Sequence, residues 1–187
     1  MYIQTPPQLP ASGPAILVCN HISGLDPLLL QSAVNRPVIW MMAAEYYDIA
    51  ALGWLFRAVR AIPVNRSGRD MAATRAALRA LDRGEVLGVF PEGRIEEGTR
   101  DLLPFQTGVA MMALRAKVPI YPAYMDGTNR GMGMLRAFLT PNDIRIRFGS
   151  AVPLEQGPGK PDLDKETDKI QSSVASLRSN MVYGRLW

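Results

Sequence analysis

Residues that build disulfide bridges and zinc sites are nearly missing from this sequence. Its 187 residues include one cysteine, Cys19, and one histidine, His21. A single cysteine forms no disulfide within the chain, which indicates a reducing compartment. One histidine and one cysteine also fall short of the ligand sets of ordinary zinc sites, so we expect no metal.

Long hydrophobic runs are missing as well. A membrane-spanning helix needs about 18 or more apolar residues in a row, and the nearest candidate, 38–59, is interrupted by Glu45, Asp48 and Arg57. Residues 1–13 contain prolines and no basic-then-apolar pattern, so they do not resemble a signal peptide. We therefore expect a cytoplasmic protein without a transmembrane helix.

The sequence also lacks a dense cluster of charge. It has 21 Lys and Arg residues against 17 Asp and Glu residues, a net charge of +4. This mild excess suits an anionic small substrate or an anionic lipid surface. Nucleic-acid binding calls for a denser basic stripe with aromatic residues between, so we expect no nucleic-acid partner.

Short apolar runs do occur, and they alternate with amphipathic segments. The runs 15–19 and 86–90 have the length and composition of buried strands, whereas one apolar stripe predicts a C-terminal helix over about 163–181. This alternation predicts an α/β fold, with a mixed, mostly parallel sheet and helices packed around it. The length suits one domain, 1–187, with a motif core at about 15–125.

The candidate catalytic residues are His21 and Asp26, in a loop after the predicted strand 15–19. Histidine suits a general base that works near neutral pH. A carboxylate in the same loop can fold back, fix the tautomer of the ring and stabilise the imidazolium. Taken alone, the pair is explained more simply by a surface loop histidine and by Asp26 as the N-cap of a helix with Pro27 at its first position.

Charged residues at two further segment ends are candidates for substrate binding. Arg66 precedes a predicted helix, where free backbone N–H groups and a guanidinium favour an anion such as phosphate. Glu92 and Arg94 follow the predicted strand 86–90, and Gly93 between them permits close backbone approach. Charges at a buried strand end are expected to be paired or to hold a ligand. A solvated arginine and a structural ion pair are the simpler alternatives for these two segments.

Four segments in this order resemble the motifs of the glycerolipid acyltransferase family, especially the 1-acylglycerol-3-phosphate acyltransferases. The family pattern has a histidine and an aspartate separated by four residues, and then an arginine after a short apolar segment. It continues with Phe-Pro-Glu-Gly and with an apolar segment that contains two prolines. The matching segments here are 21–26, 62–66, 90–93 and 118–122.

The resemblance implies an O-acyltransferase of phospholipid biosynthesis with the fold of the glycerolphosphate acyltransferases. His21 would deprotonate the hydroxyl of a lysophospholipid such as 1-acylglycerol-3-phosphate, and Asp26 would orient His21. Acyl-CoA or acyl carrier protein would supply the acyl group as co-substrate, without a cofactor or a metal. By the same resemblance the acceptor would be bound by Arg66, Glu92, Gly93 and Arg94.

The sequence departs from the family pattern in two places. Thr-Arg commonly follows Phe-Pro-Glu-Gly in the family, whereas the arginine stands one position earlier here, at Arg94. Many members also carry a membrane-embedding segment before the histidine motif, whereas nineteen residues precede Asn20. We therefore expect peripheral attachment to the inner face of the cell membrane, through an apolar patch with basic flanks.

Two other functions fit the same sequence. One is an acyltransferase for a non-phosphorylated alcohol or an amino-lipid, for which Arg66 and Arg94 would matter little. The other is a non-catalytic module that binds acyl chains, lipids or acyl carrier protein. Such a module would need neither His21 nor Asp26, so their joint presence counts against it.

Overall fold

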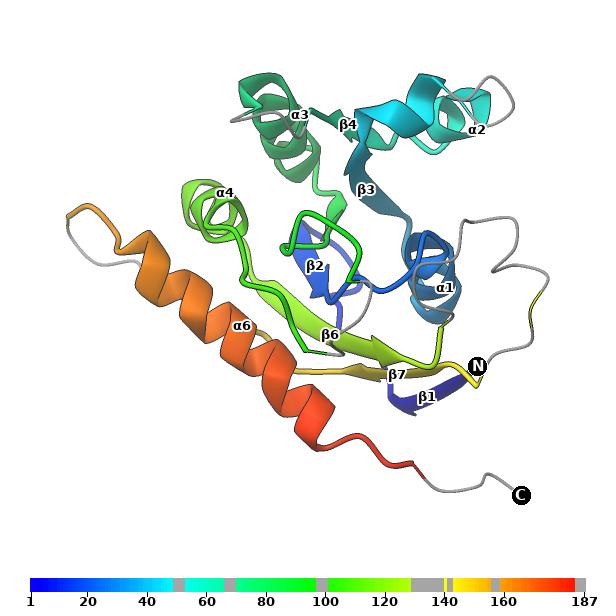
Figure 1. The fold of residues 1–187 in the computed structure, drawn as a ribbon. Helices are drawn as coiled ribbons and strands as arrows, with labels where there is room; N and C mark the ends of the chain where they lie inside the picture. The colour runs from blue at the N-terminus through cyan, green and yellow to red at the C-terminus, as the bar shows by residue number, and fades with distance from the viewer. Residues whose placement is uncertain are drawn as a thin grey trace.

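A seven-stranded sheet forms the centre of the part of the chain that the computed structural model describes, residues 1–48, 53–65, 70–96, 101–128, 140, 143–155 and 159–183 (Figure 1). The strand order is β1-β7-β6-β2-β5-β3-β4. The strands are β1 Tyr2–Thr5, β2 Ala15–Cys19, β3 Val38–Ala43, β4 Ile62–Val64, β5 Val86–Val89, β6 Ile120–Asp126 and β7 Arg145–Phe148.

Neighbouring strands of this sheet run parallel, with one exception. The exception is β6 and β7, which are antiparallel. Parallel neighbours cannot be joined by a tight hairpin, so the chain returns over the sheet by longer, mostly helical connections. The predicted mixed, mostly parallel sheet is therefore confirmed.

Helices follow most of the strands. They are α1 Asp26–Ala33, the 3-10 helix η1 Ala44–Asp48, α2 Gly53–Ala58, α3 Met71–Asp82, α4 Gly108–Ala116 and α6 Leu163–Ser179. The predicted C-terminal helix is confirmed as α6, which begins after Asp162, whose side chain accepts a hydrogen bond from the Lys165 N–H group at 3.1 Å. Within the described ranges, no helix is both long enough and apolar enough to cross a membrane.

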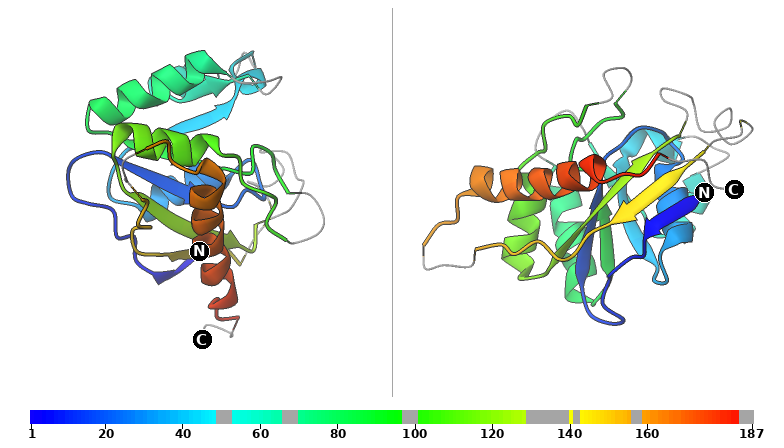
Figure 2. Two further views of the ribbon diagram at one scale, coloured as in Figure 1. Left: turned by 90° about the vertical axis from the view of Figure 1, so that its left-hand side faces the viewer. Right: turned by 90° about the horizontal axis from the view of Figure 1, so that it is seen from below.

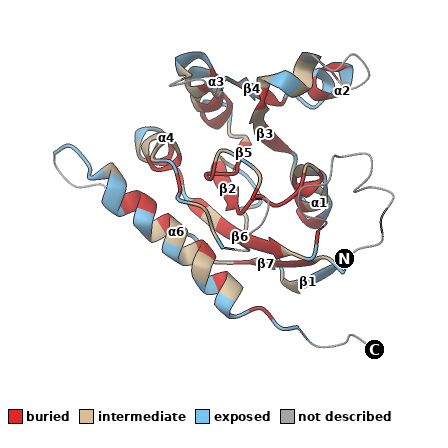
Figure 3. Cartoon of the chain, in the orientation of Figure 1, coloured by how far each residue is buried: buried red, intermediate tan, exposed pale blue. Residues whose placement is uncertain are grey.

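The sheet has a hydrophobic core on each face. Ile16 and Val18 of β2 belong to the core that includes residues of α3, α4 and α6, and Leu17 and Cys19 belong to the core that includes residues of α1. The ribbon views show α4 and α6 on one side of the central strands and α1 on the other (Figures 1 and 2). A strand with both faces covered has no solvent-facing positions, which explains the unbroken apolar run of β2. The central strands are accordingly buried along most of their length, whereas the outer side of α6 is exposed (Figure 3).

The strand β1 was not predicted. It lies at one edge of the sheet, where it pairs in parallel with β7. Tyr2 and Ile3 are both exposed, and three prolines follow the strand at positions 6, 7 and 10. Such a segment has neither the buried apolar run nor the alternation by which strands are recognised in a sequence.

Candidate active site

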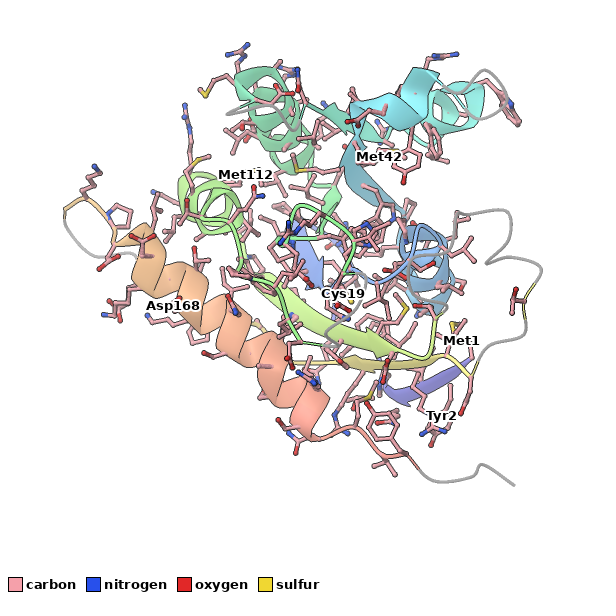
Figure 4. The ribbon with its side chains drawn as sticks, in the orientation of Figure 1. Met1, Tyr2, Cys19, Met42, Met112 and Asp168 are labelled. Carbon is pink, nitrogen blue, oxygen red and sulfur yellow. The ribbon has the colours of Figure 1, made fainter. Side chains whose placement is uncertain are left out.

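The candidate catalytic loop begins where β2 ends, near the middle of the sheet. β2 and β5 are parallel neighbours with Val18 opposite Val89, so the loops that follow them leave from the same edge. In open α/β sheets, ligands bind beyond the carboxyl ends of the strands, where neighbouring loops diverge. Cys19, the last residue of β2, marks this edge at the centre of Figure 4.

A surface cleft of about 830 Å³ lies elsewhere on the described part of the molecule. It borders the first half of α6 and the segment Val152–Pro153, and none of the candidate residues line it. Asp168, which does line it, belongs to the outer helix in Figure 4 and not to the edge that Cys19 marks. We therefore locate the active site by its chemistry and not by concavity.

Asn20 fixes the point at which the catalytic loop leaves the sheet. Its side-chain amide donates to the Met125 carbonyl at 2.9 Å, and its side-chain oxygen accepts from the Met125 N–H group at 2.8 Å. These two bonds continue the pairing of β2 with β6 beyond the end of the strand. No role for Asn20 was predicted from the sequence, although a polar residue directly after a buried apolar run was the available signal.

The side chains of His21 and Asp26 are hydrogen-bonded, with His21 Nδ1 at 2.9 Å from Asp26 Oδ2. The same oxygen accepts from the N–H groups of Ile22 at 2.7 Å and Ser23 at 2.9 Å. An ionised carboxylate only accepts hydrogen bonds, so in the neutral form of the His21 ring the proton is assigned to Nδ1. This tautomer leaves Nε2 with a lone pair that can accept a proton.

Asp26 does not cap the helix α1, so the simpler explanation of this residue is wrong. An N-cap side chain accepts from N–H groups two or three residues further into the helix, whereas Asp26 accepts from Ile22 and Ser23, which precede it. The helix begins at Asp26 itself, and its N-cap residue, Leu25, makes no side-chain capping bond. The carboxylate turns back because the loop before it offers three donors, one of them the imidazole.

One carboxylate oxygen of Asp26 is buried without a hydrogen-bond partner among the described residues. Asp26 is fully buried, and its Oδ1 atom has no hydrogen-bond partner among the described residues. A buried, unsatisfied polar atom costs about 1–3 kcal/mol. Native structures contain few such atoms, and a functional role is one of the recognised reasons to keep them.

Phe90 packs against the face of the His21 ring. The two ring centroids are 4.1 Å apart, and the ring planes are inclined by 16°. Phe90 directly follows β5, so the neighbouring strand supplies this contact. The His21 side chain is 11% exposed, which leaves one part of the ring accessible to a substrate.

Glu92 ties the catalytic loop to a second segment of the chain. Its Oε1 atom accepts from the His21 N–H group at 3.0 Å, and its Oε2 atom accepts from the Leu103 N–H group at 3.1 Å. The Glu96 N–H group in turn donates to the His21 carbonyl at 2.8 Å. Both backbone polar groups of His21 are therefore held by the loop that follows β5.

Burial raises the pKa of the Glu92 carboxyl from 4.5 to about 7. The hydrogen bonds from the N–H groups of His21 and Leu103 lower this pKa, and the nearby charges of Glu96 and Asp26 raise it. Between pH 4.5 and about 7 the folded protein therefore holds more protons at Glu92 than the unfolded chain does. The contribution of Glu92 to the free energy of unfolding falls as the pH rises through that window.

Replacing Glu92 with glutamine is expected to remove that contribution. Urea denaturation at several pH values measures the free energy of unfolding, and the wild-type protein should lose stability between pH 4.5 and about 7 relative to Glu92→Gln. Glu155→Gln is the control, because Lys169 and Lys165 lower the pKa of that exposed carboxyl. Parallel pH profiles for the wild type and Glu92→Gln would contradict the raised pKa.

Gly93 and Arg94 complete the second candidate segment. Gly93 has a φ of 71°, a left-handed backbone conformation that favours glycine. Arg94 is exposed, whereas Glu92 is buried. Glu92 accepts hydrogen bonds from two backbone N–H groups, and a ligand-binding role for Arg94 stays a prediction.

Arg66 lies outside the described residues. The helix that follows it, α3, begins at Met71, and the Asp70 carboxylate accepts from the N–H groups of Ala72 and Ala73, both at 2.9 Å. The Asp70 side chain therefore already accepts from two of the N–H groups at the start of α3, and anion binding by Arg66 stays a prediction.

Comparison with known proteins gives consistent matches. A family model described as Acyltransferase matches residues 1–126. The chain is 24% identical over 179 residues to the 1-acyl-sn-glycerol-3-phosphate acyltransferase of Bacillus subtilis (strain 168), covering 92% of this chain and 85% of that protein. It is 25% identical over 155 residues to 1-acyl-sn-glycerol-3-phosphate acyltransferase beta of Homo sapiens, covering 81% of this chain and 55% of that protein.

The match extends to other relatives and to a solved structure. The chain is 27% identical over 168 residues to the 1-acyl-sn-glycerol-3-phosphate acyltransferase of Cocos nucifera, covering 88% of this chain and 52% of that protein. It thus spans about half the length of the human and Cocos nucifera relatives. The 1-acyl-sn-glycerophosphate acyltransferase of Thermotoga maritima shares the fold, with a TM-score of 0.77, 20% identity, and coverage of 98% of this chain and 73% of that one.

Proposed function

Because the chain belongs to the acyltransferase family, we propose that it transfers a fatty acyl group from an acyl thioester to the hydroxyl of a lysophospholipid such as 1-acylglycerol-3-phosphate. The observation that carries this proposal is the 2.9 Å hydrogen bond between His21 Nδ1 and Asp26 Oδ2. It joins an imidazole to a buried carboxylate at the end of a central strand. The names of the relatives, 1-acyl-sn-glycerol-3-phosphate acyltransferases, support the choice of acceptor.

In the proposed mechanism, His21 is the general base. Nε2 takes the proton of the acceptor hydroxyl while the oxygen attacks the thioester carbonyl carbon. The carbon–sulfur bond then breaks, and the departing sulfur takes the proton from the imidazolium to leave as a thiol. Asp26 holds the ring through Nδ1 and stabilises the imidazolium between these two proton transfers.

The proposed acceptor site would comprise Arg66, Glu92, Gly93 and Arg94. Arg94 and Arg66 would supply positive charge to the acceptor phosphate, and Gly93 would let that group approach the backbone. Glu92 contributes by holding the loop of His21 at 3.0 Å and the segment of Leu103 at 3.1 Å. The acyl donor, acyl-CoA or acyl carrier protein, stays open within this proposal.

The test is thiol release from acyl-CoA, or from acyl carrier protein, in the presence of a panel of acceptors. The panel contains 1-acylglycerol-3-phosphate, the same acceptor without its phosphate, and an amino-lipid. Release that depends on the phosphorylated acceptor is the expected result. Release that is equal for all three would favour the broader acyltransferase, and the absence of any acceptor-dependent release would favour the non-catalytic module.

Arg94→Ala and Arg66→Ala are each expected to raise the KM for the phosphorylated acceptor about tenfold or more, since a charge-assisted hydrogen bond contributes about 1.5–3 kcal/mol. The KM for the non-phosphorylated acceptor should stay unchanged. Arg79→Ala removes an exposed arginine of α3 and serves as the matched control. An unchanged preference for phosphate in both variants would remove the proposed phosphate role of these residues.

Peripheral attachment to a membrane stays a prediction from the sequence. The side chain that best suits an interface in the described region is Trp54 of α2, which is 63% exposed. The basic residues Arg57 and Arg60 follow it within six positions, and aromatic and basic side chains together favour an anionic lipid surface. Sedimentation with anionic vesicles at low salt measures this attachment.

A further inference from the structure

Three aromatic rings are stacked across the middle of the sheet, and His21 is the last of them. The Trp40 and Phe90 centroids are 5.2 Å apart with planes inclined by 14°, and the Phe90 and His21 centroids are 4.1 Å apart with planes inclined by 16°. The rings come from β3, from the end of β5 and from the end of β2, which are neighbours in the sheet. We call this stack of Trp40, Phe90 and His21 the aromatic column.

Gly88 makes room for the outer end of the aromatic column. It lies opposite Trp40 in the register of β3 and β5. A Cβ atom at Gly88 would lie 2.4 Å from Cε3 of Trp40 and 2.6 Å from its Cζ3, closer than non-bonded carbons approach. The indole therefore lies over the bare backbone of Gly88, in the position from which it stacks on Phe90.

Packing alone sets the orientation of the Trp40 ring. The side chain is buried at 7% exposure, and its Nε1 atom has no hydrogen-bond partner among the described residues. Buried tryptophan N–H groups usually find a partner, so the ring keeps this position at a cost. Contacts of the indole with Phe90 on one side and with Gly88 on the other stabilise this position.

The contact with Phe90 supplies a constraint on His21 that Asp26 does not. The bond from Nδ1 to Asp26 fixes one edge of the imidazole, but the ring plane can still tilt about that bond. A flat neighbour at 4.1 Å restricts this tilt and so fixes the direction of Nε2. Proton transfer depends steeply on such geometry, and a displacement of about 1 Å can cost about 10²-fold in rate.

We propose that Trp40, seated on Gly88, is a positioning residue that acts through Phe90 to hold the plane of the His21 imidazole. This inference rests on the proposed function only where it assigns the consequence to catalysis; the stack itself is independent of it. When His21 takes up a proton, its charge comes to lie over the face of Phe90, an arrangement that attracts a cation. Neither Trp40 nor Gly88 belongs to the four motif segments.

The position of the ring can be read directly, because His21 is the single histidine of the chain. Its Cε1–H and Cδ2–H NMR signals are therefore free of overlap from other histidines, and stacking on Phe90 shifts them upfield by the ring current. Trp40→Leu and Gly88→Ala are expected to move both signals toward the values of a free imidazole. Trp40→Phe keeps a ring on Phe90 and should keep most of the upfield shift.

The catalytic consequence is measured in the acyl-transfer assay. We expect Trp40→Leu and Gly88→Ala to lower kcat about tenfold with little change in the KM of either substrate, because the base is present but misaligned. Trp40→Phe should recover most of kcat. Phe148→Leu is the matched control, since Phe148 is another buried aromatic residue of the same core, on β7. It should leave kcat and the His21 signals unchanged.

The outcomes separate this inference from the proposed function. Unchanged His21 signals in Trp40→Leu and Gly88→Ala would overturn the aromatic column as a positioning device, as would a fall in kcat no larger than that of Phe148→Leu. If Gly88→Ala does not fold, the comparison of Trp40→Leu with Trp40→Phe decides the question. A third outcome is that the His21 signals move in these variants while His21→Ala keeps full turnover. The aromatic column would then still position the ring, but its catalytic role and His21 as the base would both be overturned.

Discussion

His21→Ala should lower the acceptor-dependent kcat about 10³-fold, within the range that a general base contributes. The chain contains no second histidine that could replace it. The effect should fall on kcat more than on KM, because the imidazole acts on the hydroxyl proton in the transition state and binds neither substrate strongly in the ground state. Steady-state thiol release with the phosphorylated acceptor measures both constants.

The stability of this variant must be measured alongside its activity. The imidazole contacts Phe90 at 4.1 Å and accounts for one of the three bonds to Asp26 Oδ2, so its removal leaves a space beside a buried carboxylate. A fall in the free energy of unfolding by about 1–3 kcal/mol is therefore expected, which leaves a typical domain folded at room temperature. A folded His21→Ala protein with wild-type turnover would exclude the proposed mechanism.

Asp26→Asn should lower kcat about 10²- to 10⁴-fold. An asparagine has the same shape but no charge, so it cannot stabilise the imidazolium that forms during the reaction. Its amide group also offers one acceptor oxygen instead of two, which permits the ring to be held in the wrong tautomer. The KM values should change little, because Asp26 is fully buried and contacts the substrates only through His21.

A second substitution separates the chemical role of Asp26 from its structural role. Asp26→Ala removes the acceptor of the N–H groups of Ile22 and Ser23 as well as that of the ring, and should lower the free energy of unfolding by about 3 kcal/mol or more. Asp26→Asn should cost less stability but nearly as much activity. Asp82→Asn, at an exposed position of α3, is the control. Equal losses of stability and activity along the series would assign Asp26 a structural role alone.

The central part of the fold could be predicted because its sequence pattern is strong. The runs of β2 and β5 are apolar at every position, since both faces of these strands are covered. The edge strand β1 could not be predicted, because Tyr2 and Ile3 remain exposed and its partner in the sheet, β7, begins only at Arg145. The strand order could not be predicted from one sequence, because it also depends on contacts between segments that are far apart in the chain.

The candidate residues were predicted better than their contacts. The order of the motif segments indicated His21, Asp26 and Glu92, but the sequence left open whether Asp26 caps a helix, and the structure shows that it does not. The role of Trp40 depends on the register of β3 against β5, where a slip of one residue would turn its ring to the opposite face. No local pattern in the sequence records such a register.

The long-range hydrogen bonds of the catalytic loop can form only late in synthesis of the chain. The loop is made early, but its partners Glu92 and Met125 come 71 and 105 residues after the residues they hold. Contacts over such separations close slowly, and Asn20 lacks its two bonds to Met125 until β6 has left the ribosome. A nascent chain that ends before Met125 should therefore carry His21 and Asp26 without the two bonds that tie Asn20 to β6.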